Sequence, residues 1–399
     1  MSKQFASSHR PDRRRAIGLV GGGFVVVASA AMSGCSTAYP QATVQAWQPM
    51  PDTTDVRRFM LAHGLLAPNP HNRQPWLADL KREGELTLVC DRDRLLPETD
   101  PFGRQILIGC GAFIELAVMA AAERGFRVQV ALFPEGEPAA NELPGGRPVA
   151  RLVLQRDPSV ARDPLFAQIR RRHTNKTAYD NARQVPASEW QQLTASSRVS
   201  GASGLGLLAG EVIEPGTVDK LRQLMRASFE TEMTTPRTWL ESARLLRIGP
   251  GEIEQHRDGI SLMATMPRVL SGLGLFDRFE VPARGSSNLA RVMQRWQPQE
   301  TGSGYLWIAS RGNSRRHQVD SGRAYVRAHL QATALALDMH PQSQSLQEFA
   351  EVRAQYEAMH RLLGFDPAQT TVQMLARVGY ATAVAGPSPR RDAAGLVRA

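Results

Sequence analysis

One segment of the sequence, residues 105–124, is apolar on every side of a helix, and it constrains the fold more than any other segment. A helix without a polar face has to be buried, because an exposed side would place apolar surface in water. A second long, Ala-rich helix is predicted for residues 321–337. The two helices carry similar segments, from Gly111 and from Gly322, and a short extended segment follows each. This similarity predicts an internal duplication, although two buried helices of like composition would look the same.

The other periodic segments place the chain in the α+β class. The composition, 42% apolar and 22% charged, is that of a globular protein. Alternation and turn residues predict strands at 76–80, 86–90, 127–132, 149–155, 305–310 and 371–380, of which the first two form a hairpin. Further helices are predicted at 52–66, 164–172, 217–232 and 346–363. We expect a first half at residues 52–156 and a second at 157–399.

The first 35 residues have the pattern of an export signal. A basic start with Arg13, Arg14 and Arg15 precedes the apolar stretch 16–31, which is short for a membrane span. The segment 31–35 resembles a bacterial lipobox and predicts a lipid on Cys35, and residues 12–17 resemble a twin-arginine signal. Ordinary secretion and a plain membrane anchor are the alternatives. We expect a protein of the periplasm or cell envelope, anchored to the membrane by its lipid, with residues 36–51 as a tether.

Charge and missing motifs exclude several classes of function. The formal net charge is +10, and the signal segment holds five of the Lys and Arg residues, so the body is only mildly basic. No basic stripe with interleaved aromatic residues occurs, which argues against nucleic acid as a partner. The sequence lacks CxxC, HExxH, P-loop and GxSxG patterns, and we expect no metal. Cys90 and Cys110 either pair in an oxidising compartment or stay as buried thiols.

The loop 67–76, APNPHNRQPW, combines three prolines with three side-chain amides. Amides supply donors and acceptors in fixed geometry, and prolines reduce the entropy that is lost when a ligand orders the loop. A surface loop with a buried Trp76 is the alternative.

Two basic segments suit a phosphate monoester. The first, 169–179, contains Arg172, His173, Thr174 and Lys176, which offer positive charge and a hydroxyl. The second runs from Arg377 to Arg391 and ends in PSPRR. A solvated helix end and a Pro-rich tail are the alternatives for these two segments.

Together the three segments resemble the nitroreductase superfamily, most closely its Acg-like branch. The loop is similar to the family pattern APSxxNxQPW, with Asn69 in place of the serine, and the basic segments are similar to the family's FMN-phosphate motif and C-terminus. The resemblance implies a nitroreductase-like fold, with a central, mostly antiparallel sheet flanked by long helices, and FMN bound non-covalently. It assigns these residues to the cofactor: Pro68, Asn69, His71, Asn72, Gln74, Arg172, His173, Thr174, Lys176, Arg390 and Arg391.

The resemblance also implies a function and an assembly. It implies an FMN-dependent oxidoreductase that passes hydride or electrons to a small nitro, quinone or similar acceptor. The electron donor is unknown, because NAD(P)H is not expected outside the cytoplasm, and no catalytic residue is assigned. The alternative is an exported lipoprotein that binds or sequesters FMN. In ordinary members the basic motif precedes the loop, whereas here it follows, which predicts either a monomer built as a pseudo-dimer or a homodimer.

Two more segments recur in Acg-like proteins, residues 91–97 and 256–260. The first is either part of the site or a salt-bridged turn. The second lies in an insertion at 252–297, rich in Met, Gly and Arg. We expect this insertion to be a lid over the flavin, with a peripheral helical excursion as the alternative.

Overall fold

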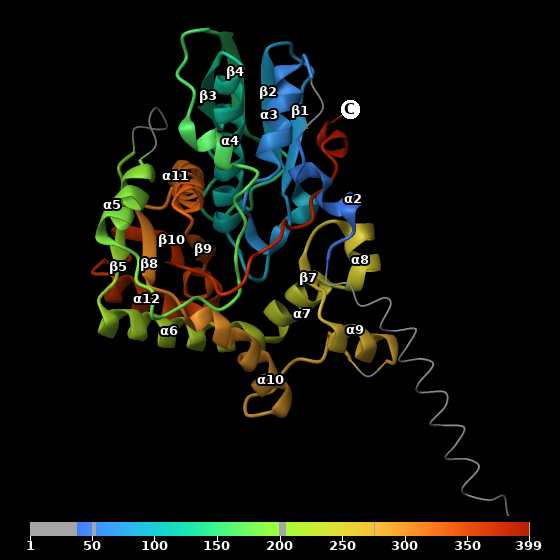
Figure 1. Ribbon diagram of the computed structural model, residues 1–399, viewed down its shortest axis with the longest axis vertical. Helices are drawn as coiled ribbons and strands as arrows, with labels where there is room; N and C mark the ends of the chain where they lie inside the picture. The colour runs from blue at the N-terminus through green and yellow to red at the C-terminus, as the bar shows by residue number, and fades with distance from the viewer. Residues whose placement is uncertain (1–37, 50–52, 199–204, 275, 399) are drawn as a thin grey trace, which may run out of the picture.

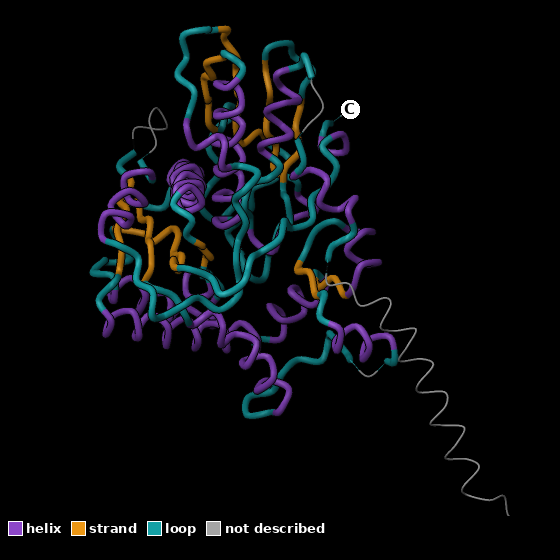
Figure 2. The backbone as a smooth tube through the Cα atoms, viewed as in Figure 1, coloured by secondary structure: helices purple, strands orange, loops and turns teal. Residues whose placement is uncertain are grey.

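A computed structural model describes residues 38–49, 53–198, 205–274 and 276–398 of the chain. The predicted signal, its lipobox and Cys35 lie outside these residues. The α+β class with antiparallel strands and long helices is confirmed, and the strands are divided between two four-stranded sheets. Figure 2 shows them as two separate groups.

The first sheet contains the predicted hairpin and two later strands, and the second contains strands from both ends of the second half. The order of the first is β1-β2-β4-β3 and that of the second is β5-β8-β10-β9, and all pairs in both are antiparallel. The first comprises β1 (Trp76–Asp79), β2 (Glu85–Cys90), β3 (Phe126–Leu132) and β4 (Pro148–Arg156). The second comprises β5 (Leu207–Val212), β8 (Gly304–Arg311), β9 (Asp338–Pro341) and β10 (Thr370–Gly379). A short parallel pair, β6 (Leu246–Ile248) and β7 (Ile260–Leu262), lies apart from both.

The two long helices, α4 (Arg104–Glu123) and α11 (Arg315–Ala334), pack against each other between the sheets (Figure 1). Their closest approach is symmetric. A Cβ on Gly111 would lie 1.9 Å from the carbonyl oxygen of Val319, and a Cβ on Gly322 would lie 1.8 Å from that of Ile108. Gly111 thus contacts the residue three positions before Gly322, and Gly322 contacts the residue three positions before Gly111. α4 is long and apolar enough to cross a membrane, but it is buried as a core helix.

Shorter helices cover the sheets and form the insertion. They are α3 (Val56–Gly64), α5 (Ala187–Ser196), α6 (Pro215–Thr234), α7 (Pro236–Arg244), α8 (Gly249–His256), α9 (Thr265–Gly272), α10 (Ser287–Trp296) and α12 (Arg353–Leu362). The predicted helix 164–172 is only a 3₁₀ turn, Pro164–Gln168, and the predicted helix 346–363 begins at Arg353. Asp163 caps the turn with its side chain. Beyond the turn, the Arg172 side chain donates to the Leu66 carbonyl at the end of α3.

The described part of the predicted tether is folded onto the body, which corrects that expectation. Residues 41–47 form a short helix, α2 (Gln41–Val44), and a 3₁₀ turn, η1 (Gln45–Trp47). The Trp47 side chain is buried, and its Nε1 donates to the Ser388 carbonyl at 2.8 Å. The absence of periodicity in this segment hid it, because a single buried Trp leaves no repeating pattern.

The C-terminal segment crosses from the second sheet back to the first half. The Arg390 amide donates to the Thr43 carbonyl at 2.8 Å, and the Arg398 amide donates to the Ala78 carbonyl at 2.8 Å. The segment thereby passes beside α2 and β1 (Figure 1). It brings Pro389, Arg390 and Arg391 to the loop 67–76.

Candidate functional site

The loop 67–76 is held in an uncommon backbone conformation. His71, Asn72 and Gln74 have φ angles of 47°, 50° and 50°, the left-handed region that residues with a side chain rarely adopt. Asn69 fixes the turn, since its Oδ1 accepts from the Gln74 amide at 2.7 Å and its Nδ2 donates to the Ala67 carbonyl at 3.1 Å. Such backbone strain persists where contacts with the surrounding protein hold the residue in place, and it is common at ligand-binding sites.

The loop's amide side chains attach it to the C-terminal segment. Asn72 donates from Nδ2 to the Pro389 carbonyl at 3.0 Å, and its Oδ1 accepts from Arg390 at 2.8 Å. The Gln74 Oε1 accepts from the Arg391 amide at 2.7 Å, and Gln74 is fully buried. These amides therefore fix the loop to the segment that carries the late arginines. Their direct contact with a flavin stays a prediction.

Two arginines from distant parts of the chain converge behind this loop. Arg172 donates to the Leu66 carbonyl at 2.8 Å, and Arg390 donates to Leu65, Leu66 and Ala67 carbonyls at 2.9, 3.2 and 3.3 Å. They share the carboxyl end of α3, which is the negative end of the helix dipole. Both guanidinium groups also lie over the Trp47 ring, at 5.7 and 5.0 Å from its centroid.

Neither guanidinium has an acidic partner in the part of the chain that the structure describes. Arg172 and Arg390 are 2% and 3% exposed, yet among the described residues neither forms an ion pair. Burial lowers the pKa of Arg172 to about 10, and burial together with the charge of Arg172 lowers the pKa of Arg390 to about 9. Both stay charged at neutral pH, and burying an uncompensated ion costs on the order of several kcal/mol. The site therefore carries two buried positive charges that are stabilised by carbonyls at the end of α3 and by no acid of the described residues.

Lys176 adds a third positive charge to the predicted site, and two histidines of the site are uncharged. Lys176 is exposed, although the surrounding protein atoms desolvate it enough to lower its pKa. Burial, followed by the charge of Lys176, lowers the pKa of His71 to about 4. Burial and the charge of Arg172 lower the pKa of His173 to about 4. We call Arg172 and Arg390, together with Lys176 from the same basic segment as Arg172, the unpaired cation cluster; His71 and His173 are neutral at pH 7.

Three nitrogens of the predicted site residues lack a hydrogen-bond partner within the described ranges. The Nδ1 of His71, the Nε of Arg172 and the Nε2 of His173 have no hydrogen-bond partner in the described part of the chain. Buried nitrogens of this kind normally find a protein or ligand partner. The Nε of Arg172 is a donor that suits a phosphate oxygen, whereas the neutral His173 ring donates to the Ala385 backbone and keeps its Nε2 as an acceptor.

The remaining predicted residues contribute in different ways. Pro68 and Thr174 are half-buried and lie in the segments that carry the cluster. Arg391 does not join the cluster. Its guanidinium donates to the Gln74 carbonyl at 3.2 Å and lies 3.9 Å from Asp91. It therefore secures the loop instead of leaving a charge free.

Sequence reasoning missed two residues of the site. Trp47 supplies the ring over which both guanidinium groups lie, and it also packs against His173 with ring centroids 5.0 Å apart. His329, on α11, is buried with its Nδ1 at 3.5 Å from Arg172 and 3.3 Å from the Tyr325 hydroxyl. The sequence offered no specific signal for His329, because Arg327 and Gln331 are polar neighbours in the same predicted helix.

A second group of arginines lies on the other side of the loop and is paired. Asp258 accepts from Arg73 and Arg94 at 2.9 Å each, and from Arg247 at 2.7 Å. Asp258 is buried, and the Arg257 carbonyl next to it accepts from Gln74 Nε2 at 2.8 Å. We call these four residues the Asp258 cluster. It links the predicted lid, 252–297, to the loop 67–76 through Arg73 and to the turn 91–94 through Arg94. Asp258 and Arg94 belong to the two further segments, 256–260 and 91–97, that the sequence analysis considers.

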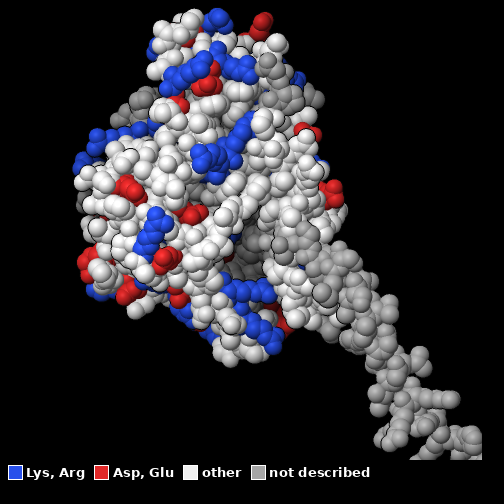
Figure 3. Space-filling model, viewed as in Figure 1, with Lys and Arg blue, Asp and Glu red and all other residues white. Residues whose placement is uncertain are grey.

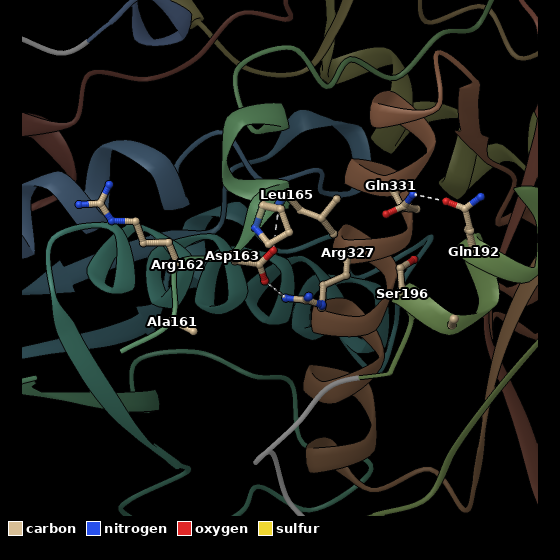
Figure 4. A pocket seen from close by; sticks show the side chains of 10 residues that line it. Ala161, Arg162, Asp163, Leu165, Gln192, Ser196, Arg327 and Gln331 are labelled. Carbon is tan, nitrogen blue, oxygen red and sulfur yellow. Dashed lines mark hydrogen bonds and ion pairs between the residues drawn. The ribbon is translucent and has the colours of Figure 1, made fainter. Parts of the chain in front are cut away.

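A surface pocket lies away from both clusters. It has a volume of about 530 Å³ and is lined by α5, α11 and the turn at Pro164, with Asp163, Gln192, Arg327 and Gln331 facing it (Figure 4). Arg327 is paired with Asp163 at 2.7 Å, so the pocket has no unpaired charge there. The charged side chains on the face drawn in Figure 3 are scattered and mixed in sign. Within the described ranges, no group of His, Cys, Asp and Glu is arranged to hold a metal ion.

Comparison with solved structures aligns just over half of the chain. A nitroreductase of Bacteroides fragilis with bound FMN aligns over 57% of this chain and 95% of its own, at 12% identity and a TM-score of 0.34. The FMN-dependent nitroreductase NfnB of Mycobacterium smegmatis, in complex with NADPH, aligns over 54% and 86%, at 14% identity and a TM-score of 0.34. The fold described above rests on its own strand pairing and not on these alignments.

Comparison of sequences reaches further along the chain. No protein-family model matches it. A "Putative NAD(P)H nitroreductase" of Mycobacterium tuberculosis is 27% identical over 358 residues, which is 87% of this chain and 92% of that protein. Another from the same organism, named acg, is 39% identical over 88 residues, 21% of this chain and 26% of that protein. This similarity, together with the loop motif, supports the assignment of the chain to the nitroreductase superfamily.

Proposed function

We propose that the chain is an exported, lipid-anchored oxidoreductase that binds FMN non-covalently at the loop 67–76, with the FMN phosphate at the unpaired cation cluster. One observation carries the proposal: Arg172 and Arg390 are buried together and form no ion pair with any acid of the described residues. A phosphate dianion would balance both charges. The resemblance of the loop 67–76 and the two basic segments to nitroreductase motifs makes FMN the phosphate ester to test.

The chain's own residues would bind and orient the cofactor. Arg172, whose Nε has no acceptor among the described residues, would donate to the phosphate. Arg390 donates to backbone carbonyls, Asn72 and Ser388, so it would contribute its charge, and Lys176 would add charge from the solvent side. The strained loop, fixed by Asn69, Asn72 and Gln74, provides a rigid wall that loses little entropy on binding. When bound, FMN supplies hydride and electron transfer through its N5. We name no catalytic acid or base; the acceptor is a small nitro, quinone or similar compound, and the electron donor is open.

The test is the absorption spectrum of the purified protein, followed by heat release of any chromophore. We expect flavin bands and FMN in equimolar amount. The Arg172→Gln variant should retain much less FMN, whereas Arg162→Gln, at an exposed position by the surface pocket, should retain it as the parent does. A colourless protein that also fails to take up added FMN would contradict the proposal.

A second candidate function, FMN binding without turnover, is favoured by the Asp258 cluster. Three ion pairs to one buried carboxylate fasten the predicted lid to the loop. A lid held shut would keep bulky acceptors from the flavin. Mixing the dithionite-reduced protein with a small quinone and with a bulky one distinguishes the two functions. Reoxidation by both supports an oxidoreductase, and reoxidation by neither supports sequestration.

The assembly follows from the same arrangement. The loop 67–76 lies before the first sheet and the basic segment 169–179 after it, and one chain brings both to the cation cluster. A monomer therefore contains a complete set of cluster residues. Light scattering during size exclusion should give the mass of one chain per FMN. An obligate dimer that loses its flavin on dilution would contradict this part of the proposal.

A further inference from the structure

One patch of large apolar side chains is exposed on α9 and the loop after it. Met266, Val269 and Leu273 are spaced i, i+3 and i+7, so they share one face of the helix. Their exposed fractions are 67%, 45% and 66%, and Phe279 is 49% exposed. A surface helix of a globular protein normally turns its apolar stripe toward the core. α9 turns its stripe toward solvent.

The patch is concentrated. Four of the nine large apolar side chains that are exposed in the described residues lie between Met266 and Phe279. The charged residues in this segment are Arg268, Asp277 and Arg278, and Arg278 is paired with Glu252 at 2.6 Å. Exposed apolar surface that is gathered in one place marks an interaction site, since single exposed apolar residues are common and patches are not.

The patch lies next to the start of the described chain. The Tyr39 hydroxyl is hydrogen-bonded to the Ser261 side chain in β7, and β7 ends three residues before α9 begins. α2, which begins at Gln41, packs against α8 (Figure 1). Cys35 precedes Tyr39 by four residues, so the chain between their Cα atoms spans at most about 14 Å. A lipid on Cys35 would therefore enter its membrane close to α9.

We propose that the α9 face, formed by Met266, Val269, Leu273 and Phe279, docks on the lipid bilayer that holds the acylated Cys35. The inference rests on the export and lipid attachment in the proposed function and is independent of the flavin. Interfacial helices bury such apolar faces at the boundary of headgroups and acyl chains. Because residues 39–47 pack on the body, the short connection to Cys35 would keep this face, and no other, against the membrane.

The test places a fluorophore on the patch. The mature, acylated protein carrying Leu273→Cys is labelled with an environment-sensitive dye and reconstituted in vesicles of phosphatidylethanolamine and phosphatidylglycerol. Cys90 and Cys110 are buried and do not compete for the dye. The control is Glu83→Cys, an exposed position in the turn between β1 and β2, at the end of the molecule far from α9 in Figure 1.

We expect a blue shift and quenching by a lipid-borne quencher at residue 273 and neither change at residue 83. Equal, water-like signals at both positions would overturn the inference. So would a blue shift at residue 273 that rises with protein concentration without vesicles, because a second copy would then cover the face. A mass spectrum without an acyl group on Cys35 would also overturn it. A protein without flavin that still shows the expected pattern would sink the flavin proposal alone.

Discussion

Two groups of arginines flank the same loop, and they differ in whether an acid accompanies them. Asn72 is bonded to Arg390 of the unpaired cation cluster, whereas the next residue, Arg73, is bonded to Asp258. Three arginines share the buried Asp258, while Arg172 and Arg390, at 2% and 3% exposure, pair with none of the acids in the described ranges. A folded chain keeps buried charges when they are compensated. The paired group therefore reads as a structural fastening, and the unpaired group as half of a binding site.

The largest expected effect separates the two groups by stability. Asp258→Asn leaves three arginines around an uncharged side chain, and breaking a buried pair in this way costs about 3–5 kcal/mol. Urea unfolding measures the loss. Asp219→Asn serves as the control, because Asp219 pairs with Arg222 on an exposed helix face and should cost less than about 1 kcal/mol. Equal effects of the two substitutions would show that the Asp258 cluster is no fastening.

The next effect concerns affinity for FMN. Arg172→Gln should weaken FMN binding about 10- to 100-fold, the value of one or two charge-assisted hydrogen bonds. Without FMN, the free energy of unfolding of the variant should be no more than about 1 kcal/mol below that of the parent, because the substitution removes an uncompensated buried charge. Calorimetric titration and urea unfolding measure the two quantities. A variant that loses 3 kcal/mol or more of stability without FMN, as roughly expected for a broken pair, would show that Arg172 is compensated after all.

The third effect is a pH dependence that belongs to the unpaired side. Burial lowers the pKa of His71 and His173 to about 4, so both are neutral in the folded protein and take up protons on unfolding below about 6.5. Each histidine therefore lowers the free energy of unfolding as the pH falls from 6.5 toward 4. The loss is about 1 kcal/mol at pH 5 after allowing for partial exposure. Unfolding at pH 7 and pH 5 measures this loss.

The His173→Gln variant isolates the contribution of that histidine. Glu232 and Asp100 act in the opposite direction, because burial raises their pKa to about 7 and about 6, but they are the same in both proteins and cancel. The variant should lose less stability than the parent between pH 7 and pH 5. A loss of equal size in both proteins would mean that His173 already titrates normally in the fold.

The smallest effect is expected at Lys176. Its side chain is exposed, so solvent screens its charge, and Lys176→Gln should weaken FMN binding only a few-fold, below about 1 kcal/mol. The loss should shrink further in 0.5 M salt, whereas that of Arg172→Gln should persist, since buried charges are screened less. Equal salt dependence of the two variants would place both charges in solvent.

Repeating patterns in the sequence predicted most helices and strands but not the contacts between segments far apart in the chain. The hairpin 76–90 and the helix at 104–123 follow from alternation and from an all-apolar face, which are local signals. The close approach of Gly111 and Gly322 was visible only as a likeness of two segments. The return of the C-terminal segment to Ala78 left no periodic signal, because its bonds join residues more than 300 positions apart.

The site was predictable as a set of segments and not as an arrangement. The loop and both basic segments do meet, through Arg172, Asn72 and Arg390. The sequence could not show that the side-chain amides of Asn72 and Gln74 form hydrogen bonds with the C-terminal segment. Nor could it show that Arg391 lies near an acid, Asp91, while Arg390 has none among the described residues. Those differences depend on which neighbour is within hydrogen-bond distance, and that is decided by tertiary packing. Trp47 was overlooked for the same reason.

The central claim is that the unpaired cation cluster holds a phosphate, and the most direct test compares FMN with riboflavin, which lacks it. Both ligands are titrated into the flavin-free protein under one set of conditions. Two buried guanidinium groups on one phosphate predict that FMN binds about 100-fold or more tightly than riboflavin, and that Arg172→Gln reduces this ratio without changing the affinity for riboflavin. Equal affinities for the two ligands would contradict the account.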